Sequence, residues 1–355
     1  MRVNPGAHGG PAYTVSVSAV PGVGHHQKRE GFAMRAAVYD RYGPPEVLHI
    51  AEVGEPTVSE SEVLVRVRAS SVNSWDCDNV RGSPFLARAV GGPIRPRLRV
   101  LGADVAGEVT AVGRLVTRFK PGDEVLGDLS SSGWGGFAEF ASAHEDALVR
   151  KPAALAFEQA AAIPQAGVLA LQAVGRSDAW QGKRVLINGA GGGVGTFAIQ
   201  LARAAGARVT GVDATAKLEF MRSLGVESVI DYTREDLADL AERYDLIIDV
   251  SAHRSMSDYR RLLAPDGRYV MVGGATSRIL QLLLFGAWGA ATRSDRTMAL
   301  LVHQPNRDLD HLAALAAAGT VVPVIDRTCE LADVAAAIRH VSEGHAKGKV
   351  VVTVA

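Results

Sequence analysis

The chain has 355 residues, of which 47% are hydrophobic and 21% are charged, so it can bury a large core and is long enough for two domains. The 38 Lys and Arg residues balance the 38 Asp and Glu residues, and this neutral charge argues against binding to nucleic acid or to an anionic membrane. The 2 cysteines, Cys77 and Cys329, are too few for a disulfide framework and suit a reducing cytoplasm, where we expect the protein to be located.

The first 33 residues are rich in glycine and proline and show neither helical nor strand periodicity. They also lack the continuous apolar core of a secretory signal. We therefore expect residues 1–33 to be a disordered leader, with the folded unit starting near Met34.

From Met34 to about Ala154, short runs typical of β-strands are separated by turn residues. From about Glu158, candidate strands alternate with helical segments rich in alanine and leucine. This alternation predicts an α/β fold with a parallel, doubly wound sheet covered by helices on both faces. The expected strands are Arg184–Gly189, Ala207–Asp213, Ser228–Tyr232, Tyr244–Val250 and Gly267–Gly274.

The most apolar stretch, Ile279–Thr292, is shorter than the roughly 20 apolar residues needed to span a bilayer. We expect a buried helix or an apolar lid there, which could form either a wall for a hydrophobic acceptor or a dimer interface. Two helices, Asp308–Ala318 and Leu331–Glu343, and a final strand, Lys349–Val354, follow. Because a terminal strand needs a neighbour, we expect residues 34–157 and 299–355 to form one discontinuous domain beside a second domain at 158–298.

The strongest chemical signal is the segment Arg184–Asp213, in which a strand runs through a glycine turn into a helix and then into a second strand. Such a turn lets the backbone approach a pyrophosphate at the positive end of the helix. Its fingerprint is A-x-G-x-x-G, formed by Ala190, Gly192, Gly193, Val194 and Gly195. The order of strand, turn, helix and strand predicts a dinucleotide site.

Residues that follow the second and third strands bear on the choice of nucleotide. Asp213 stands near the position of an acid that binds the adenosine ribose of NAD, and its charge would repel a 2′-phosphate. Thr215, Lys217 and Tyr232 could instead hold that phosphate. These residues leave the choice between NAD and NADP open.

Three residues after the fourth and fifth strands are further candidates. We expect the backbone of Gly273 and Gly274 to lie beside the nicotinamide, with a simple strand-ending turn as the alternative. His253 could touch cofactor or substrate, although a structural histidine is the more common case.

From Met34 to Ala355 the chain resembles the medium-chain dehydrogenase/reductase superfamily, and within it the zinc-independent quinone oxidoreductase group. The resemblance rests on the segments Ser70–Gly82, Val100–Gly113, Phe119–Asp128, Gly135–Phe140, Asn188–Gly195, Lys217–Gly225 and Gly344–Val352. It implies a GroES-like distorted β-barrel domain beside a Rossmann domain, a cleft between them, a homodimer, and NADPH held near Lys217 and Tyr232. Asp213 replaces a small or uncharged residue common in that group, which keeps NADH possible.

The zinc branch of the same superfamily places its metal ligands at positions that match Asn73, Ala103 and Gln165. Amides and a methyl group cannot replace thiolates and imidazole around Zn²⁺. We therefore expect no zinc.

Without a metal, the expected reaction is hydride delivery from NAD(P)H to a small electrophilic acceptor, a quinone or an α,β-unsaturated carbonyl compound. Asn73 is the candidate donor to the developing oxyanion, with an asparagine that satisfies its own turn as the alternative. Asp78 and Gln165 are candidate substrate contacts. Asp78 stands where some quinone oxidoreductases carry a tyrosine, so solvent could supply the proton.

Two other functions stay open. One is an enoyl-thioester reductase or a tailoring reductase of secondary metabolism, which would need a long channel and basic residues for a phosphopantetheine arm. The other is a redox sensor that binds NADPH with little turnover, an alternative raised by the missing tyrosine.

Overall fold

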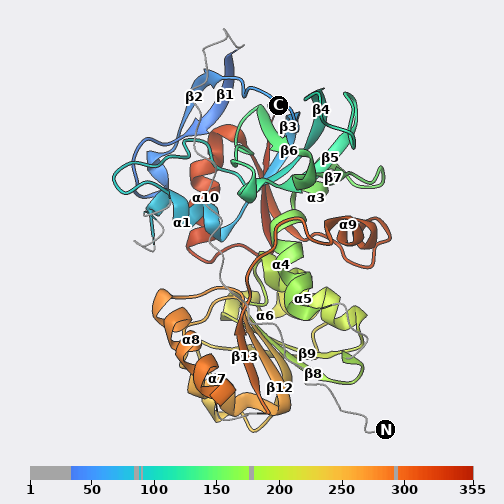
Figure 1. Cartoon of the computed structure of the whole chain (residues 1–355). Coiled ribbons are helices and arrows are strands. Elements are labelled where there is room, and N and C mark those ends of the chain that lie inside the picture. Colours follow the sequence, from blue (N-terminus) through green and yellow to red (C-terminus); the bar gives the residue numbers. More distant parts are fainter. Residues whose placement is uncertain (1–32, 84–87, 89–90, 176–179, 292–294, 355) are drawn as a thin grey trace, which may run out of the picture.

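The computed structural model of the protein describes residues 33–83, 88, 91–175, 180–291 and 295–354. They form two lobes, shown one above the other in Figure 1. The predicted leader at residues 1–33 lies outside the described residues except for Ala33, where the first strand begins.

The first lobe is built around β3 (Glu62–Val72), whose mostly buried residues pair antiparallel with β4 (Asp104–Val112). Within the described residues its main sheet has seven strands, in the order β14-β15-β3-β4-β5-β7 with β6 paired to β3. The other strands of the sheet are β5 (Glu124–Asp128), β6 (Phe140–His144), β7 (Val149–Arg150), β14 (Ile325–Glu330) and β15 (Lys349–Thr353). A separate antiparallel pair consists of β1 (Ala33–Val38) and β2 (His49–Gly54).

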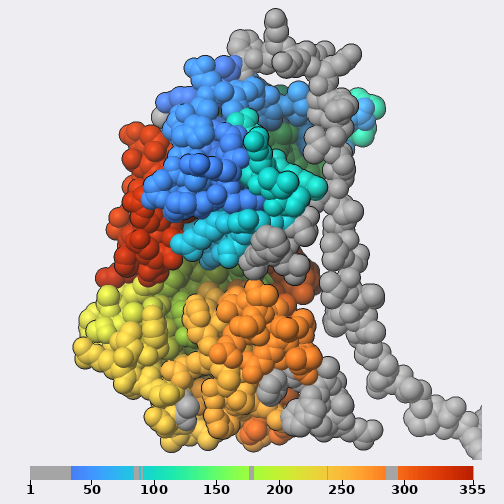
Figure 2. Space-filling model, turned by 90° about the vertical axis from the view of Figure 1, so that its left-hand side faces the viewer, coloured from blue at the N-terminus to red at the C-terminus, as the bar shows by residue number. Residues whose placement is uncertain are grey.

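The C-terminal strand lies inside this sheet. β15 runs parallel to β14 and antiparallel to β3, and its residues Lys349–Val352 are buried. Figure 2 shows the C-terminal segment, in red, packed beside N-terminal residues, in blue, in the same lobe. The ends of the described chain therefore meet in one lobe.

The second lobe contains a parallel sheet, for which the described residues give six strands in the order β10-β9-β8-β11-β12-β13. β8 (Arg184–Asn188) is central, with β9 (Arg208–Asp213) on one side and β11 (Tyr244–Asp249) on the other. The remaining strands are β10 (Ser228–Asp231), β12 (Leu263–Met271) and β13 (Thr297–Leu300). The predicted doubly wound sheet is confirmed, and β13 continues it just past the predicted boundary at residue 298.

Helices surround the sheets and connect the lobes (Figure 1). They are α1 (Ser74–Arg81), α3 (Phe157–Ala161), α4 (Pro164–Val174), α5 (Gly193–Ala204), α6 (Leu218–Ser223), α7 (Met256–Leu262), α8 (Thr276–Ala291), α9 (Leu309–Ala317) and α10 (Val334–Ser342). α4 packs against α5, and the apolar residues of the two helices belong to one hydrophobic core. No helix in the described part of the chain combines the length and apolarity needed to cross a membrane.

The apolar stretch expected to form a buried helix lies in α8. Leu282 is 2% exposed, whereas Leu280, Leu283 and Leu284 are 60%, 57% and 67% exposed. α8 contacts β13 and α7, and the expectation of a buried helix is wrong for the three exposed leucines.

Candidate active site

A cavity of about 700 Å³ lies between the two lobes. The first lobe contributes Val72–Ser74, Val341 and Glu343–Lys349; the second contributes Ala166, Asn188, Gly189, Gly192–Val194, Asp213, Ala214, Ala216, Lys217, Tyr232, Leu237, Val250, Ser251, His253, Arg254 and Tyr259. Most residues of the second lobe follow the carboxyl ends of β8, β9 and β11. From β8 the chain first adds β9 and β10 on one side and then crosses to add β11, β12 and β13 on the other side. Parallel α/β sheets bind ligands where the strand order changes direction in this way.

The glycine turn borders this cavity at the start of α5. A Cβ on Gly195 would lie 2.3 Å from the carbonyl oxygen of Gly189, so only glycine permits the close packing of helix and strand there. A Cβ on Gly192 would meet its nearest neighbour, the same oxygen, at 3.5 Å, which leaves the cavity side open. Gly192 caps α5, so the first N–H groups of the helix face the cavity edge. Ala190, at the first fingerprint position, is buried, and its N–H donates to the carbonyl of Val212.

Asp213 is tied to the glycine turn. Its Oδ2 accepts from Gly191 N at 2.9 Å and its Oδ1 accepts from Ala214 N at 2.9 Å. Lys217 Nζ lies 3.7 Å from Asp213 Oδ1, and both side chains are 10% exposed. A Cβ on Gly191 would come within 2.8 Å of Lys217 Cδ, so this glycine is needed to accommodate the pair.

The other two residues predicted near the adenosine phosphate differ in their placement. Tyr232 is 51% exposed and lines the cavity. Thr215 is absent from the residues that line it, and its hydroxyl donates to Asp231 and lies 3.2 Å from that of Thr233.

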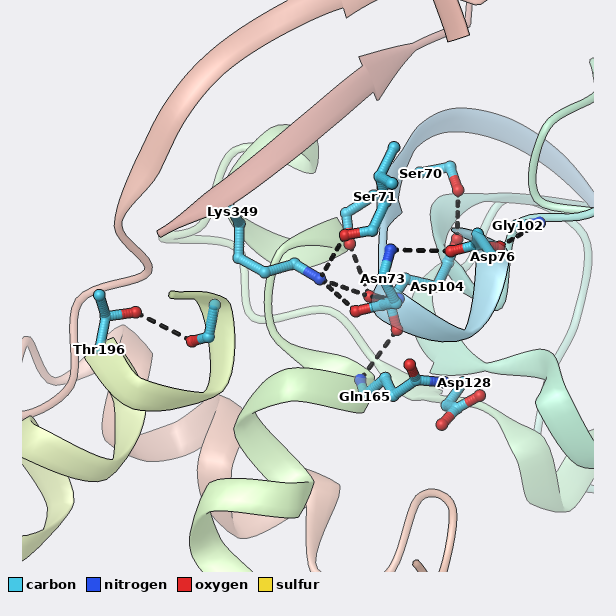
Figure 3. Close-up of polar contacts among 12 residues, drawn as sticks. Ser70, Ser71, Asn73, Asp76, Gly102, Asp104, Asp128, Gln165, Thr196 and Lys349 are labelled. Atoms are coloured by element: carbon cyan, nitrogen blue, oxygen red, sulfur yellow. Dashed lines mark hydrogen bonds and ion pairs between the residues drawn. The ribbon is translucent and has the colours of Figure 1, made fainter. Parts of the chain in front are cut away.

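On the opposite wall, Asn73 lies at the start of α1 and is 6% exposed. Its backbone N–H donates to Asp76 Oδ2 at 2.8 Å, which fixes the turn without using the amide side chain. The side chain instead donates from Nδ2 to Asp104 Oδ2 at 2.9 Å and accepts at Oδ1 from Lys349 Nζ at 2.5 Å (Figure 3). The alternative that Asn73 serves only its own turn therefore does not account for its side-chain bonds.

Asp104 is the centre of this buried network and has no exposed surface. Its Oδ2 accepts from Ser71 Oγ at 2.5 Å and from Lys349 Nζ at 3.3 Å, in addition to Asn73. Its Oδ1 accepts from the backbone N–H of Gln165 at 2.8 Å, at the start of α4 (Figure 3). The network thus joins both strand β3 and strand β15 to the helix that leads into the second lobe.

Asp76, in the first turn of α1, is also fully buried. Burial raises the pKa of its carboxyl group to about 7, although hydrogen bonds from Asn73 N and Gly102 N act in the opposite direction. Asp104 raises this pKa further and Lys349 lowers it. A carboxyl group whose pKa is raised toward neutral pH therefore accepts the backbone N–H of Asn73.

Family models match both lobes: "Alcohol dehydrogenase GroES-like domain" at residues 59–153 and "Zinc-binding dehydrogenase" at residues 224–352. The chain is 33% identical to "Quinone-oxidoreductase QR1, chloroplastic" of Triphysaria versicolor, over 91% of this chain and 99% of the relative. The chain belongs to the quinone oxidoreductase group of the medium-chain dehydrogenase/reductase superfamily.

Two further similarities agree with this membership. "NADPH-dependent alkenal/one oxidoreductase, chloroplastic" of Arabidopsis thaliana is 31% identical over 90% of this chain and 79% of the relative. The solved quinone oxidoreductase from Coxiella burnetii superposes with a TM-score of 0.82 at 30% identity, covering 91% of this chain and 100% of that one. The first lobe is GroES-like, as predicted, and the protein is an NAD(P)H oxidoreductase.

Not every predicted site residue of this quinone oxidoreductase-group protein reaches the cavity. Asp78 is exposed on α1, and Gly273 and Gly274 pair with the segment around Ala252; none of the three is among the lining residues. Gln165 is 3% exposed, joins the network through its backbone, and has no hydrogen-bond partner for Nε2 within the described structure. His253 lines the cavity, with Nε2 3.1 Å from Ser251 Oγ.

The sequence analysis missed Lys349 and Asp104. Both stand in segments that carry the family resemblance, and each is a charged residue inside an apolar run, LGADVAG for Asp104 and KVVVTV for Lys349. A charged residue in a predicted interior strand needs a partner of opposite charge, and this signal could have marked both residues as members of a buried polar network.

Proposed function

We propose that the protein transfers a hydride from NADPH to a quinone or an α,β-unsaturated carbonyl compound without zinc. The observation that carries this proposal is the shared cavity, which has the glycine turn on one wall and the Asn73 amide on the other. Quinone and alkenal/one reduction are the activities that the names of two similar proteins state.

The choice of NADPH is supported by the adenosine end of the cavity. Lys217 and Tyr232 both line it and can donate to a phosphate. The oxygens of Asp213 already accept hydrogen bonds from backbone N–H groups, and the nearby Lys217 offsets its negative charge. We therefore interpret Asp213 as a residue that stabilises the glycine turn. NADH is the second candidate, because Asp213 still lies on the cavity wall.

The absence of zinc is proposed from donor chemistry. The positions that match the ligands of the zinc branch hold Asn73, Ala103 and Gln165, and the ammonium group of Lys349 bonds to the first of them. Within the described residues no group of three or more His, Cys, Asp or Glu side chains could hold a metal. A buried cation beside amide ligands disfavours Zn²⁺ at this place.

When bound, NADPH supplies the hydride. The glycine turn and the first turn of α5 hold the pyrophosphate, because their N–H groups border the cavity. Asn73 Nδ2 has two N–H bonds, and the one not directed to Asp104 donates to the acceptor oxygen as negative charge develops on it. Solvent supplies the proton in this scheme.

We further propose that the protein forms a homodimer and acts on a small molecule. The exposed leucines of α8 support a contact between copies, since three of them lie on the surface. A cytoplasmic location stays a prediction from the low cysteine content.

The test follows NADPH absorbance with 1,4-naphthoquinone, trans-2-hexenal and a crotonyl thioester in parallel. Turnover of the quinone or the enal supports the proposal. Turnover of the thioester alone would favour the enoyl-thioester reductase. Tight NADPH binding without any turnover would favour the sensor.

A further inference from the structure

Lys349 connects the cofactor side of the cavity to Asn73. It is the first residue of β15 and follows Gly348, whose N–H donates to the carbonyl of Gly191 in the glycine turn at 3.0 Å. The Lys349 side chain crosses the start of α5, where its Cδ lies 2.9 Å from the position of a Cβ on Gly193. One side chain thus spans from the nucleotide turn to the first lobe, as Figure 3 shows.

The ammonium group of Lys349 is fully engaged. The residue is 2% exposed, and burying a charge is costly unless it is paired and hydrogen-bonded. Its three N–H bonds have three acceptors: Val72 O at 3.2 Å, Asn73 Oδ1 at 2.5 Å and Asp104 Oδ2 at 3.3 Å. No N–H of Lys349 is left for a substrate in this arrangement, so it does not act on the acceptor directly.

The same contacts determine which way the Asn73 amide points. Its oxygen faces the cation of Lys349 and its nitrogen faces the carboxylate of Asp104. A flipped amide would turn its oxygen toward the carboxylate and its N–H bonds toward the ammonium group, which can only donate. Charges of opposite sign on the two sides of the amide therefore allow one orientation, and they fix the direction of its second N–H bond.

We propose that Lys349 is a positioning residue, which orients the Asn73 amide so that its second N–H points at the carbonyl oxygen of the hydride acceptor. This inference rests on the proposed function, because it assigns how that site aligns its substrate. Gly348 and Gly193 link the orientation to the turn that holds the nucleotide, so the donor and the hydride source share one frame.

The test is a double-mutant cycle of Lys349→Met and Asn73→Ala with 1,4-naphthoquinone as the acceptor. Removing a donor to an oxyanion typically costs about 100-fold in rate, so Lys349→Met is expected to lower kcat/KM by about 10- to 100-fold. NADPH affinity stays within about twofold, and the primary isotope effect with C4-deuterated NADPH increases because the hydride step has slowed. In the Asn73→Ala background, Lys349→Met adds less than about twofold, since it acts through that amide.

Lys151→Met is the matched control. Lys151 is also a buried lysine of the first lobe, with a side chain that is 4% exposed, a carboxylate partner in Glu124 at 2.9 Å and an acceptor in Leu155 O at 2.6 Å. It does not line the cavity, so kcat/KM and the isotope effect are expected to stay at wild-type values.

Lys349→Met leaves the carboxylate of Asp104 without its cation, which can prevent folding. The double variant Lys349→Met/Asp104→Asn removes both charges, and the same loss of kcat/KM is expected because nothing then selects the amide orientation. Full kcat/KM in either variant, or losses that add in the cycle, would overturn the inference while the proposed function stands. A wild-type protein that reduces none of the acceptors would overturn the proposed function, and this inference with it.

Discussion

Asp76 is expected to make the stability of the protein depend on pH between about 4 and 7. Its pKa rises from the ordinary value of 3.8 to about 7 in the folded protein, a difference of about three pH units. At about 1.4 kcal/mol per unit, this corresponds to about 4 kcal/mol of free energy of unfolding. The group is fully buried, so solvent screening does not reduce the value.

The sign follows from which state holds the proton. Below pH 4 both the folded and the unfolded protein carry a protonated Asp76, and its contribution to stability is fully present. As the pH rises to 7, the unfolded chain loses the proton while the folded protein keeps it, so the free energy of unfolding decreases. Above pH 7 both states are ionised and the contribution no longer changes.

The measurement compares the wild type with Asp76→Asn by urea unfolding at several pH values from about 4.5 to about 7.5. This range covers most of the interval between the pKa of Asp76 in the unfolded chain and its pKa in the folded protein. Asparagine cannot ionise, and it loses one of the two backbone donors, Asn73 N or Gly102 N, because it offers a single oxygen. The variant is therefore less stable at low pH, and the gap narrows by up to about 4 kcal/mol as the pH rises. Parallel stability curves for the two proteins would refute the reasoning about buried Asp76.

Three other outcomes are expected. Lys217→Ala weakens NADPH binding by about 1–3 kcal/mol more than NADH binding in a calorimeter, and equal weakening would contradict the phosphate role. Gly195→Ala abolishes binding of NADPH and of NADH, because the added Cβ would lie 2.3 Å from a backbone oxygen. Gly54→Ala is the control, because an added Cβ there meets nothing within 4 Å. Nucleotide binding retained by Gly195→Ala would show that this turn does not hold the nucleotide. Elemental analysis of the pure protein finds no stoichiometric zinc, and EDTA leaves naphthoquinone reduction unchanged; one zinc per chain would reverse the donor argument.

The glycine turn was predictable because it is local. A strand, a glycine-rich turn and a helix follow one another in the chain, and the steric need for glycine is strict at Gly195. The parallel, doubly wound sheet of the second lobe was predictable for a similar reason, since alternating strands and helices allow few topologies.

The cavity wall that carries Asn73 was only partly predictable because its contacts are distant in sequence. Asn73, Asp104 and Lys349 come from three separate segments, and their pairing depends on how β15 enters the sheet next to β3. The partner of a buried charge cannot be read from its own strand. For α8, apolar composition alone did not reveal that Leu280, Leu283 and Leu284 are exposed.

The position of β15 has a consequence for synthesis on the ribosome. The second lobe and its glycine turn emerge complete before the last residues of the chain, whereas the first lobe lacks an interior strand until Lys349–Thr353 have been made. A nascent chain can therefore fold its second lobe early, but the cavity is complete only after β15 has been made and has entered the sheet. Loss of β15 would remove Lys349 from the cavity and an interior strand from the sheet, so chains that lack it are expected to lose both activity and stability.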